Sequence, residues 1–94
     1  MSSYDYIVVG AGSAGCVMAA RLSEDATKTV LLLEAGPEDK SMWIDIPAGF
    51  SKLLNSPTYN WNFETEPDPG MHNRKIPIPR GKTLGGSSSI NGML

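Results

Sequence analysis

One stretch near the amino end constrains the fold more than any other, an apolar run that breaks into a glycine-rich turn. The run Tyr6 to Val9 is typical of a strand that is buried on both faces of a parallel sheet. Gly10, Gly12 and Gly15 follow it in the spacing G-x-G-x-x-G, and small or apolar residues then continue from 14 to 20. This order predicts a strand, a tight turn and the start of a buried helix.

The three glycines suit a turn that holds a pyrophosphate. Gly10 permits the tight turn, Gly12 lets the backbone approach the phosphates, and Gly15 lets the helix pack close to the strand. The helix start offers unpaired N–H groups and a partial positive charge to the anion. The alternative is a glycine-rich turn without a ligand, but the flanking strand and helix favour a dinucleotide site.

A second apolar run, Thr29 to Leu33, predicts a second strand that ends at Glu34. Glu34 follows the last glycine at about the 20-residue spacing of dinucleotide-binding units. A carboxylate at this place accepts both hydroxyls of an adenosine ribose and repels a 2′-phosphate, which favours FAD or NAD over NADP. The alternative is a solvated glutamate at a strand end. Residues 1–36 are therefore expected to form an α/β, Rossmann-like βαβ unit.

The segment 37–80 contains all seven prolines and shows no sustained helical or strand period. A short helix is expected from Pro47 to Leu54 and a short strand over 59–63. Five aromatic residues argue against disorder, and we expect the segment to cover a cofactor or a partner domain, with Trp61 in the core. The only histidine, His72, is expected in a polar surface turn rather than as a catalytic base.

The segment 81–94 is rich in glycine and serine. Gly85 and Gly86, followed by 87–91, fit a flexible linker as well as they fit a loop that enters a helix and turns its backbone donors toward an anion. Arg80 and Lys82 suit either a phosphate or a solvated loop.

Residues 6–36, 59–67 and 81–91 together resemble the amino-terminal end of the glucose–methanol–choline (GMC) oxidoreductases, with most similarity to bacterial choline dehydrogenase-like and alcohol dehydrogenase-like members. The stretch from Gly81 to Asn91 matches the first part of that family's signature. The resemblance therefore favours a binding site over a linker. It also places the stretch around Trp61 near the segment that covers the flavin, but an aromatic residue in a loop-rich region is more often in the core, and the core position is the one we expect.

The resemblance implies a non-covalently bound FAD in a larger two-domain GMC fold. The 1–36 unit, the 37–80 excursion and the 81–94 motif would then be parts of one incomplete FAD-binding domain. Some members attach the flavin through a histidine where this chain has Ile90, so no covalent link is expected. The residues implied for FAD are Gly10, Gly12, Ser13, Ala14 and Gly15 at the pyrophosphate, Glu34 and Ala35 at the adenosine, and Thr83, Gly86, Asn91, Gly92, Met93 and Leu94 along the diphosphate and isoalloxazine.

The implied activity is oxidation of an alcohol CH–OH group by hydride transfer to flavin N5. The catalytic histidine of the family and its partner lie near the carboxyl end of full-length members, so no catalytic residue is expected in this chain. Hydroxynitrile lyases and fatty-acid photodecarboxylases carry the same motifs, and they stay as alternatives together with a non-catalytic binding fragment. The electron acceptor is left open.

Length and composition set the remaining expectations. Ninety-four residues are too few for a complete doubly wound domain, so the expected partners are the remainder of the same enzyme and a small alcohol. A net charge of −2 argues against nucleic acid.

The lone Cys16 suits a reducing compartment and a buried position in the helix, and it gives no basis for a disulfide or a metal site. The absence of a signal peptide and of a membrane-spanning apolar run predicts a cytoplasmic protein, with peripheral membrane contact left open.

Overall fold

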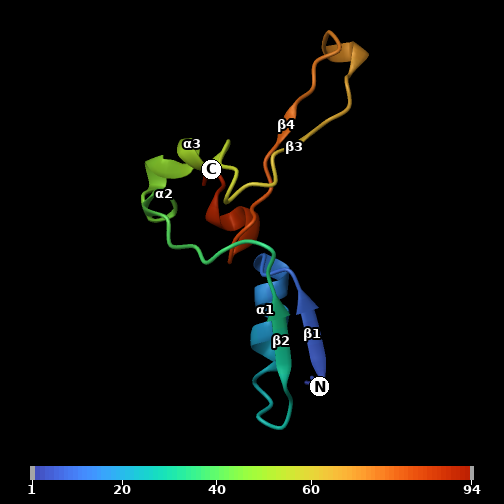
Figure 1. The fold of residues 1–94 in the computed structure, drawn as a ribbon, viewed down its shortest axis with the longest axis vertical. Coiled ribbons are helices and arrows are strands. Elements are labelled where there is room, and N and C mark those ends of the chain that lie inside the picture. Colours follow the sequence, from blue (N-terminus) through green and yellow to red (C-terminus); the bar gives the residue numbers. More distant parts are fainter. Residues whose placement is uncertain (1, 94) are drawn as a thin grey trace.

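The computed structural model describes residues 2–93, which form an elongated molecule of 55 × 31 × 26 Å (Figure 1). A βαβ unit lies at one end of the long axis, and an antiparallel ribbon projects at the other end. No helix in this described range is long and apolar enough to cross a bilayer. The elements in chain order are β1 (Tyr6–Val9), α1 (Ser13–Leu22), β2 (Val30–Leu33), α2 (Met42–Asp45), the 3₁₀ helix η1 (Pro47–Gly49), α3 (Phe50–Leu53), β3 (Phe63–Glu64), the 3₁₀ helix η2 (Pro69–Met71), β4 (Pro77–Ile78) and the 3₁₀ helix η3 (Gly86–Ser89).

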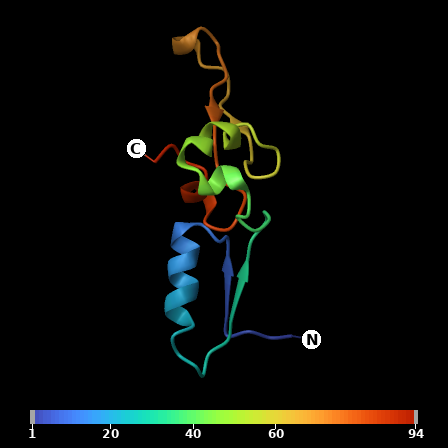
Figure 2. The ribbon, with the colours of Figure 1, turned by 90° about the vertical axis from the view of Figure 1, so that its left-hand side faces the viewer.

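The predicted strand, turn, helix and second strand are confirmed at the amino end. β1 and β2 pair in parallel, in a register that runs from Tyr6 opposite Val30 to Val9 opposite Leu33. α1 connects them and lies on one side of the two strands (Figure 2). Gly10 has a φ of +96°, which the tight turn requires and which a residue with a Cβ rarely adopts.

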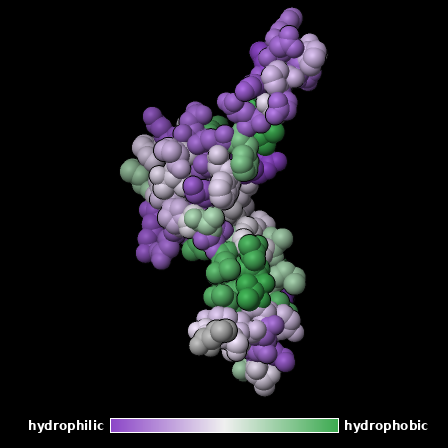
Figure 3. Space-filling view, turned by 45° about the vertical axis from the view of Figure 1, so that its right-hand side comes forward, coloured by the Kyte–Doolittle hydropathy of each residue, from purple (hydrophilic) through white to green (hydrophobic). Residues whose placement is uncertain are grey.

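The burial predicted for this unit is not found within the chain. α1 has no buried residue, and Val9 and Val17 are 82% and 60% exposed. Hydrophobic surface accordingly gathers over the βαβ unit (Figure 3). The prediction of a buried Cys16 is also wrong, because this residue is exposed and its Sγ donates to the Ala11 carbonyl at 3.3 Å. The two-stranded sheet is covered by α1 on one face, and no other helix or strand among the described residues packs extensively on it.

Short helices form the middle of the molecule. The helix expected from Pro47 is confirmed as η1 followed directly by α3. α2 was not predicted, and it begins after Ser41, whose hydroxyl accepts a hydrogen bond from the Trp43 N–H at 3.2 Å. Leu53 of α3 is 2% exposed, so this cluster supplies part of the small core.

Residues 59–82 form the projecting antiparallel ribbon (Figure 1). β3 pairs with β4, and single bridges join Asn60 to Gly81 at the base and Asp68 to Arg74 near the tip. The strand expected over 59–63 is interrupted because Asn62 has a φ of +55°. His72 lies exposed at the tip, as the prediction of a surface turn required.

The second glycine segment lies against the first, since the Gly85 N–H donates to the Ala11 carbonyl and η3 contacts α1. The buried apolar residues of the described chain are Ala11 of the first segment, Leu53 of α3 and Ile90 of the second segment. η3 replaces the expected α-helix after Gly85, and the segment is tied to its surroundings rather than free as a linker would be.

A clamp of hydrogen bonds joins Asp5, which precedes β1, to Thr29, which precedes β2, and it predicts that the stability of the fold depends on pH. The Asp5 carboxylate accepts from the Thr29 N–H at 2.8 Å and from the Thr29 hydroxyl at 3.1 Å. These two bonds, the backbone one foremost, hold the pKa of Asp5 below its ordinary value. The stabilisation is therefore present above the unfolded-state pKa of about 3.9 and is lost as the pH falls through the lower folded-state value.

We expect Asp5→Asn to lower the free energy of unfolding of the intact protein at neutral pH, and the difference from wild type to shrink below about pH 4. Urea unfolding at a series of pH values measures this difference. Asp39→Asn, at an exposed position, is the matched control and should show no such trend. A gap between Asp5→Asn and wild type that is constant with pH would contradict the clamp.

Candidate functional site

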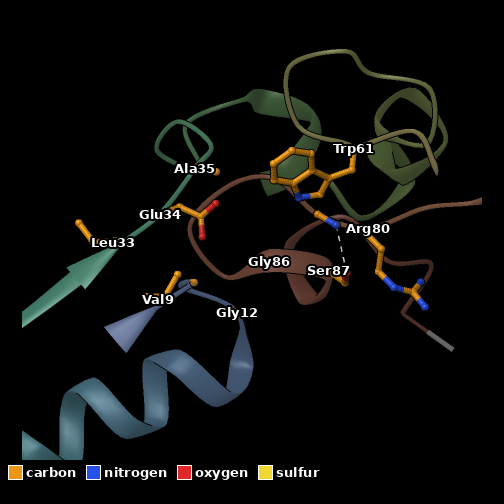
Figure 4. Close-up of a pocket in the computed structure, with 11 residues that line it drawn as sticks. Val9, Gly12, Leu33, Glu34, Ala35, Trp61, Arg80, Gly86 and Ser87 are labelled. Atoms are coloured by element: carbon orange, nitrogen blue, oxygen red, sulfur yellow. Dashed lines mark hydrogen bonds between the residues drawn. The ribbon is translucent and has the colours of Figure 1, made fainter. Parts of the chain in front are cut away.

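One cavity of about 570 Å³ lies beyond the carboxyl ends of β1 and β2, where parallel sheets place their ligands (Figure 4). One wall comes from the βαβ unit and the other from the base of the ribbon and the second glycine segment. The cavity therefore brings together three segments that are far apart in the sequence. Its lining residues are Val9, Gly10, Gly12, Leu33, Glu34, Ala35, Trp61, Arg80, Gly81, Gly86 and Ser87.

The two glycine segments meet through their main chains. The Gly85 N–H donates to the Ala11 carbonyl at 2.7 Å. Gly86 has a φ of +61°, and a Cβ at this position would lie 2.8 Å from the Cα of Gly12. This close approach excludes any larger residue at Gly86, because such a residue would push the two walls apart.

Gly12 and Gly15 differ in what surrounds them. A Cβ at Gly15 would lie 1.8 Å from the carbonyl oxygen of Gly10, so the helix could not pack this close to the turn. A Cβ at Gly12 would meet nothing within 4 Å, although Gly12 lines the cavity. The protein itself needs glycine at position 15, whereas the space beside Gly12 is left open within the cavity.

The start of α1 offers backbone donors beside the cavity. Gly12 caps the helix without a side-chain hydrogen bond, and the first turn contains no acidic residue. The N–H groups of Ser13, Ala14 and Gly15 have no acceptor within residues 2–93. Free N–H groups at a helix start bind anions, with help from the helix dipole.

Glu34 is fixed by the backbone on both of its oxygens. Oε2 accepts from the Ala11 N–H at 2.8 Å, and Oε1 accepts from the Gly36 N–H at 2.9 Å. The side chain is half-buried and lines the cavity, which distinguishes it from a freely solvated glutamate. A carboxylate has about four acceptor positions, so roughly two stay free for a ligand. Glu34 thus ties the glycine turn to the end of β2 and still presents acceptors to the cavity.

The structure brings some of the predicted site residues together and separates others. Gly10, Gly12, Glu34, Ala35 and Gly86 line the cavity, with Ser13, Ala14 and Gly15 directly behind Gly12 at the helix start.

Thr83 does not reach the cavity. It is fully buried, its hydroxyl donates to the Pro37 carbonyl at 2.7 Å, and its own carbonyl accepts from the Gly86 N–H at 2.9 Å. Asn91 and Met93, on either side of Gly92, line a second cavity of about 250 Å³ with residues of α2 and α3. Leu94 lies outside the described residues.

The cavity also contains residues that were not among the predicted site residues, namely Val9, Leu33, Trp61, Arg80, Gly81 and Ser87, of which Trp61 and Arg80 carry the largest polar side chains. Trp61 is 44% exposed on the cavity wall, so its assignment to the core was wrong. Arg80 lines the cavity beside it, and the two residues are paired through the main chain, since the backbone N–H of Trp61 donates to the Arg80 carbonyl at 3.0 Å. Lys82 instead places its Nζ 5.0 Å from the centre of the Trp61 ring. The position of Trp61 follows from the pairing of 59–61 with 80–82, which the structure shows and which no pattern in the sequence predicts.

The described residues give no comparable support for a metal centre. Among residues 2–93, histidine, cysteine, aspartate and glutamate do not form a group of three or more that could hold an ion. The polar groups that the cavity offers include backbone N–H groups and an indole N–H, which donate hydrogen bonds, and the Glu34 carboxylate, which accepts them, and this set suits an organic anion with hydroxyl groups.

Comparison with known proteins gives one family. The family model described as GMC oxidoreductase matches residues 4–94. The oxygen-dependent choline dehydrogenase of Vibrio vulnificus (strain YJ016) is 58% identical over 91 residues, and so is the alcohol dehydrogenase [acceptor] of Pseudomonas putida. Each alignment covers 97% of this chain and 16% of the relative.

Solved structures agree with the sequence matches. Pyridoxine 4-oxidase from "Mesorbium loti" superimposes with a TM-score of 0.90 at 42% identity, over 97% of this chain and 18% of that chain. A variant of the Aspergillus oryzae RIB40 formate oxidase, solved to examine its FAD modification, gives a TM-score of 0.79 at 39% identity, over 94% of this chain and 16% of that chain. This chain thus spans less than a fifth of the length of the proteins that it matches.

The Glu34 clamp leads to a prediction that needs no ligand. Glu34→Gln leaves one oxygen and places an amide group where the second acceptor was, so one of two backbone N–H groups loses its partner. We expect the intact protein, stripped of ligand, to lose about 1–3 kcal/mol of unfolding free energy in urea. Glu38→Gln, which removes only an exposed ion pair with Lys40, should cost less than about 1 kcal/mol. Equal effects of the two variants would argue that the Glu34 bonds contribute nothing to stability.

Proposed function

This chain belongs to the GMC oxidoreductase family, and from that premise we propose that it is the FAD-binding part of an enzyme that oxidises an alcohol. The observation that carries the proposal is the single cavity in which the glycine turn, the start of α1, Glu34 and the second glycine segment meet.

The residues present fit the chemical groups of FAD. The diphosphate is anionic, and the free N–H groups of Ser13, Ala14 and Gly15 are donors beside the open space at Gly12. The adenosine ribose offers two hydroxyls, and Glu34, next to Ala35, retains acceptor positions for them.

We assign the pyrophosphate to the turn from Gly10 to Gly15 and the adenosine to Glu34 and Ala35. Gly86 forms the opposite wall, and Thr83 supports it through the hydrogen bond from the Gly86 N–H. Asn91, Gly92, Met93 and Leu94 are assigned to the flavin end. Ile90 is 2% exposed and carries no nucleophile, which supports a non-covalently held cofactor.

We further propose that β1, α1 and β2 begin a Rossmann-like sheet within a two-domain fold. The exposed apolar side chains of this unit, among them Val9 and Val17, support this proposal because further strands and helices would cover them. Residues 1–36, 37–80 and 81–94 are then parts of one FAD-binding domain, and the remainder of the enzyme is its partner.

An alcohol is the proposed electron donor. Choline, the alcohols and pyridoxine in the names of three relatives all carry a CH–OH group, whereas formate does not. Bound FAD supplies the two-electron acceptor, with N5 as the atom that receives hydride. The residues of this chain bind and orient the cofactor, and the catalytic base belongs to the proposed remainder.

The intact protein should therefore hold FAD and lose its flavin absorption when an alcohol is added without oxygen. Absorption spectra of the purified protein, followed by anaerobic titration with a panel of primary alcohols, measure both properties. NAD in place of a flavin, or a flavin that no alcohol reduces, would sink the proposal.

The glycine turn offers a paired test of cofactor binding. Gly12→Ala places a methyl group in open space at a φ of −75°, so the unliganded protein should stay within about 1 kcal/mol of wild type while FAD binds roughly tenfold more weakly. Gly15→Ala meets the Gly10 carbonyl and should cost about 2 kcal/mol or more of stability without any ligand. Urea unfolding of the unliganded protein and FAD titration measure the two effects. Unchanged FAD affinity in Gly12→Ala would contradict the assigned pyrophosphate position.

A further inference from the structure

Trp61 is the aromatic side chain that lines the cavity of Glu34, although the sequence predicted a core position for it rather than a contact with a ligand. The indole stands on the wall formed by the ribbon base and faces the side that carries Glu34 and Ala35 (Figure 4). It is 44% exposed within this chain, so a ligand in the cavity can reach it.

The backbone at Trp61 is held in place by a buried amide. Asn60 is 2% exposed, and its Nδ2 donates to the Leu54 carbonyl at 2.6 Å. Its Oδ1 accepts from the Asn62 N–H at 2.9 Å and from the Arg80 N–H at 3.2 Å. Moving the wall away from the cavity would therefore break hydrogen bonds of a buried polar group, which is costly.

The π system of the Trp61 ring already has two partners within the chain. Phe63 stacks on it with ring centres 5.9 Å apart and an interplanar angle of 2°. The ammonium group of Lys82 lies 5.0 Å from the ring centre, in the range of a cation–π contact. These two contacts fix the orientation of the indole and involve its π system.

The edge of the ring is different, because the indole Nε1–H donates no hydrogen bond to an acceptor within residues 2–93. Figure 4 shows this nitrogen on the edge that faces the cavity. An indole nitrogen only donates hydrogen bonds, so its partner must be an acceptor atom of the ligand or a water molecule.

We propose that Trp61 is a cofactor-binding residue that acts through its indole N–H, by donating to an oxygen of the adenosine diphosphate half of FAD. This inference rests on the proposed function, because it takes FAD as the ligand. The adenosine diphosphate half is favoured because Trp61 shares its cavity with Glu34, whereas Asn91 and Met93 line the other cavity. The nearby Lys82 ammonium adds a positive potential that suits phosphate oxygens.

Trp61→Phe distinguishes the contribution of the indole N–H from that of the aromatic ring, because phenylalanine keeps an aromatic ring and lacks the donor. We expect the dissociation constant of FAD from the intact protein to rise about tenfold, as for the loss of one good hydrogen bond to a charged group. ADP, which lacks the flavin, should compete with FAD in wild type, and its dissociation constant should rise by a similar factor in the variant.

Trp43→Phe is the matched control. Trp43 is 40% exposed and has a lysine ammonium 5.9 Å from its ring centre, but it lies on the second cavity. Its ADP affinity should equal that of wild type. Urea unfolding of the unliganded variants verifies that each is folded, and Trp61→His provides a second variant that restores an N–H donor on a smaller ring and should recover part of the affinity.

The outcomes are distinct. FAD and ADP affinities that are unchanged in Trp61→Phe but lost in Trp61→Leu would show that only the ring matters, and would overturn the inference. Wild-type protein in which ADP does not displace FAD would overturn the assignment to the adenosine diphosphate half. Wild-type protein that binds no FAD would instead refute the proposed function itself.

Discussion

The contact on which the rest of the molecule depends is the main-chain junction between the two glycine segments. The Gly85 N–H donates a hydrogen bond to the Ala11 carbonyl, and Gly86 lies against Gly12 at a distance that only glycine permits. Ala11 is completely buried there, although the first segment otherwise belongs to a largely exposed unit. Without this junction, the βαβ unit would present an open edge and the second wall of the cavity would have no fixed position. Backbone atoms rather than side chains thus set the shape of the site.

Buried polar side chains hold the loop-rich part of the chain to that junction. Thr83 and Asn60 are both almost fully buried, and each uses its side chain to satisfy backbone groups of distant segments. Thr83 reaches Pro37, where the chain leaves β2, and Asn60 joins the end of α3 to the base of the ribbon. Such groups are costly to bury unless they are paired, and they specify one arrangement when they are. They explain how a proline-rich stretch without a regular sheet is ordered.

Sequence patterns predicted the features of the fold that depend on residues close together in the chain. The strand, turn, helix and strand of residues 6–33, the special backbone of Gly10 and the surface position of His72 all follow from neighbouring residues. The patterns failed for Cys16 and Trp61, which were expected to be buried and are exposed. Apolar character predicts that a residue will be covered, but not by which part of the protein. The ribbon was missed because its strands are only two residues long and pair across a tip that carries no regular pattern.

The same arrangement bears on how ligand binding and folding are coupled. Only three apolar residues of the described chain are buried, so the hydrophobic contribution that holds the two cavity walls together is small. A ligand that touches Glu34 on one wall and Trp61 on the other bridges segments that otherwise meet through a few main-chain bonds. With FAD bound as proposed, a free concentration of 1,000 times the dissociation constant would add about 4 kcal/mol to the stability of the folded state. That is comparable to the whole stability of a small domain, which is about 5 kcal/mol at the low end. The cofactor would therefore serve as part of the core that holds the two walls of the cavity together.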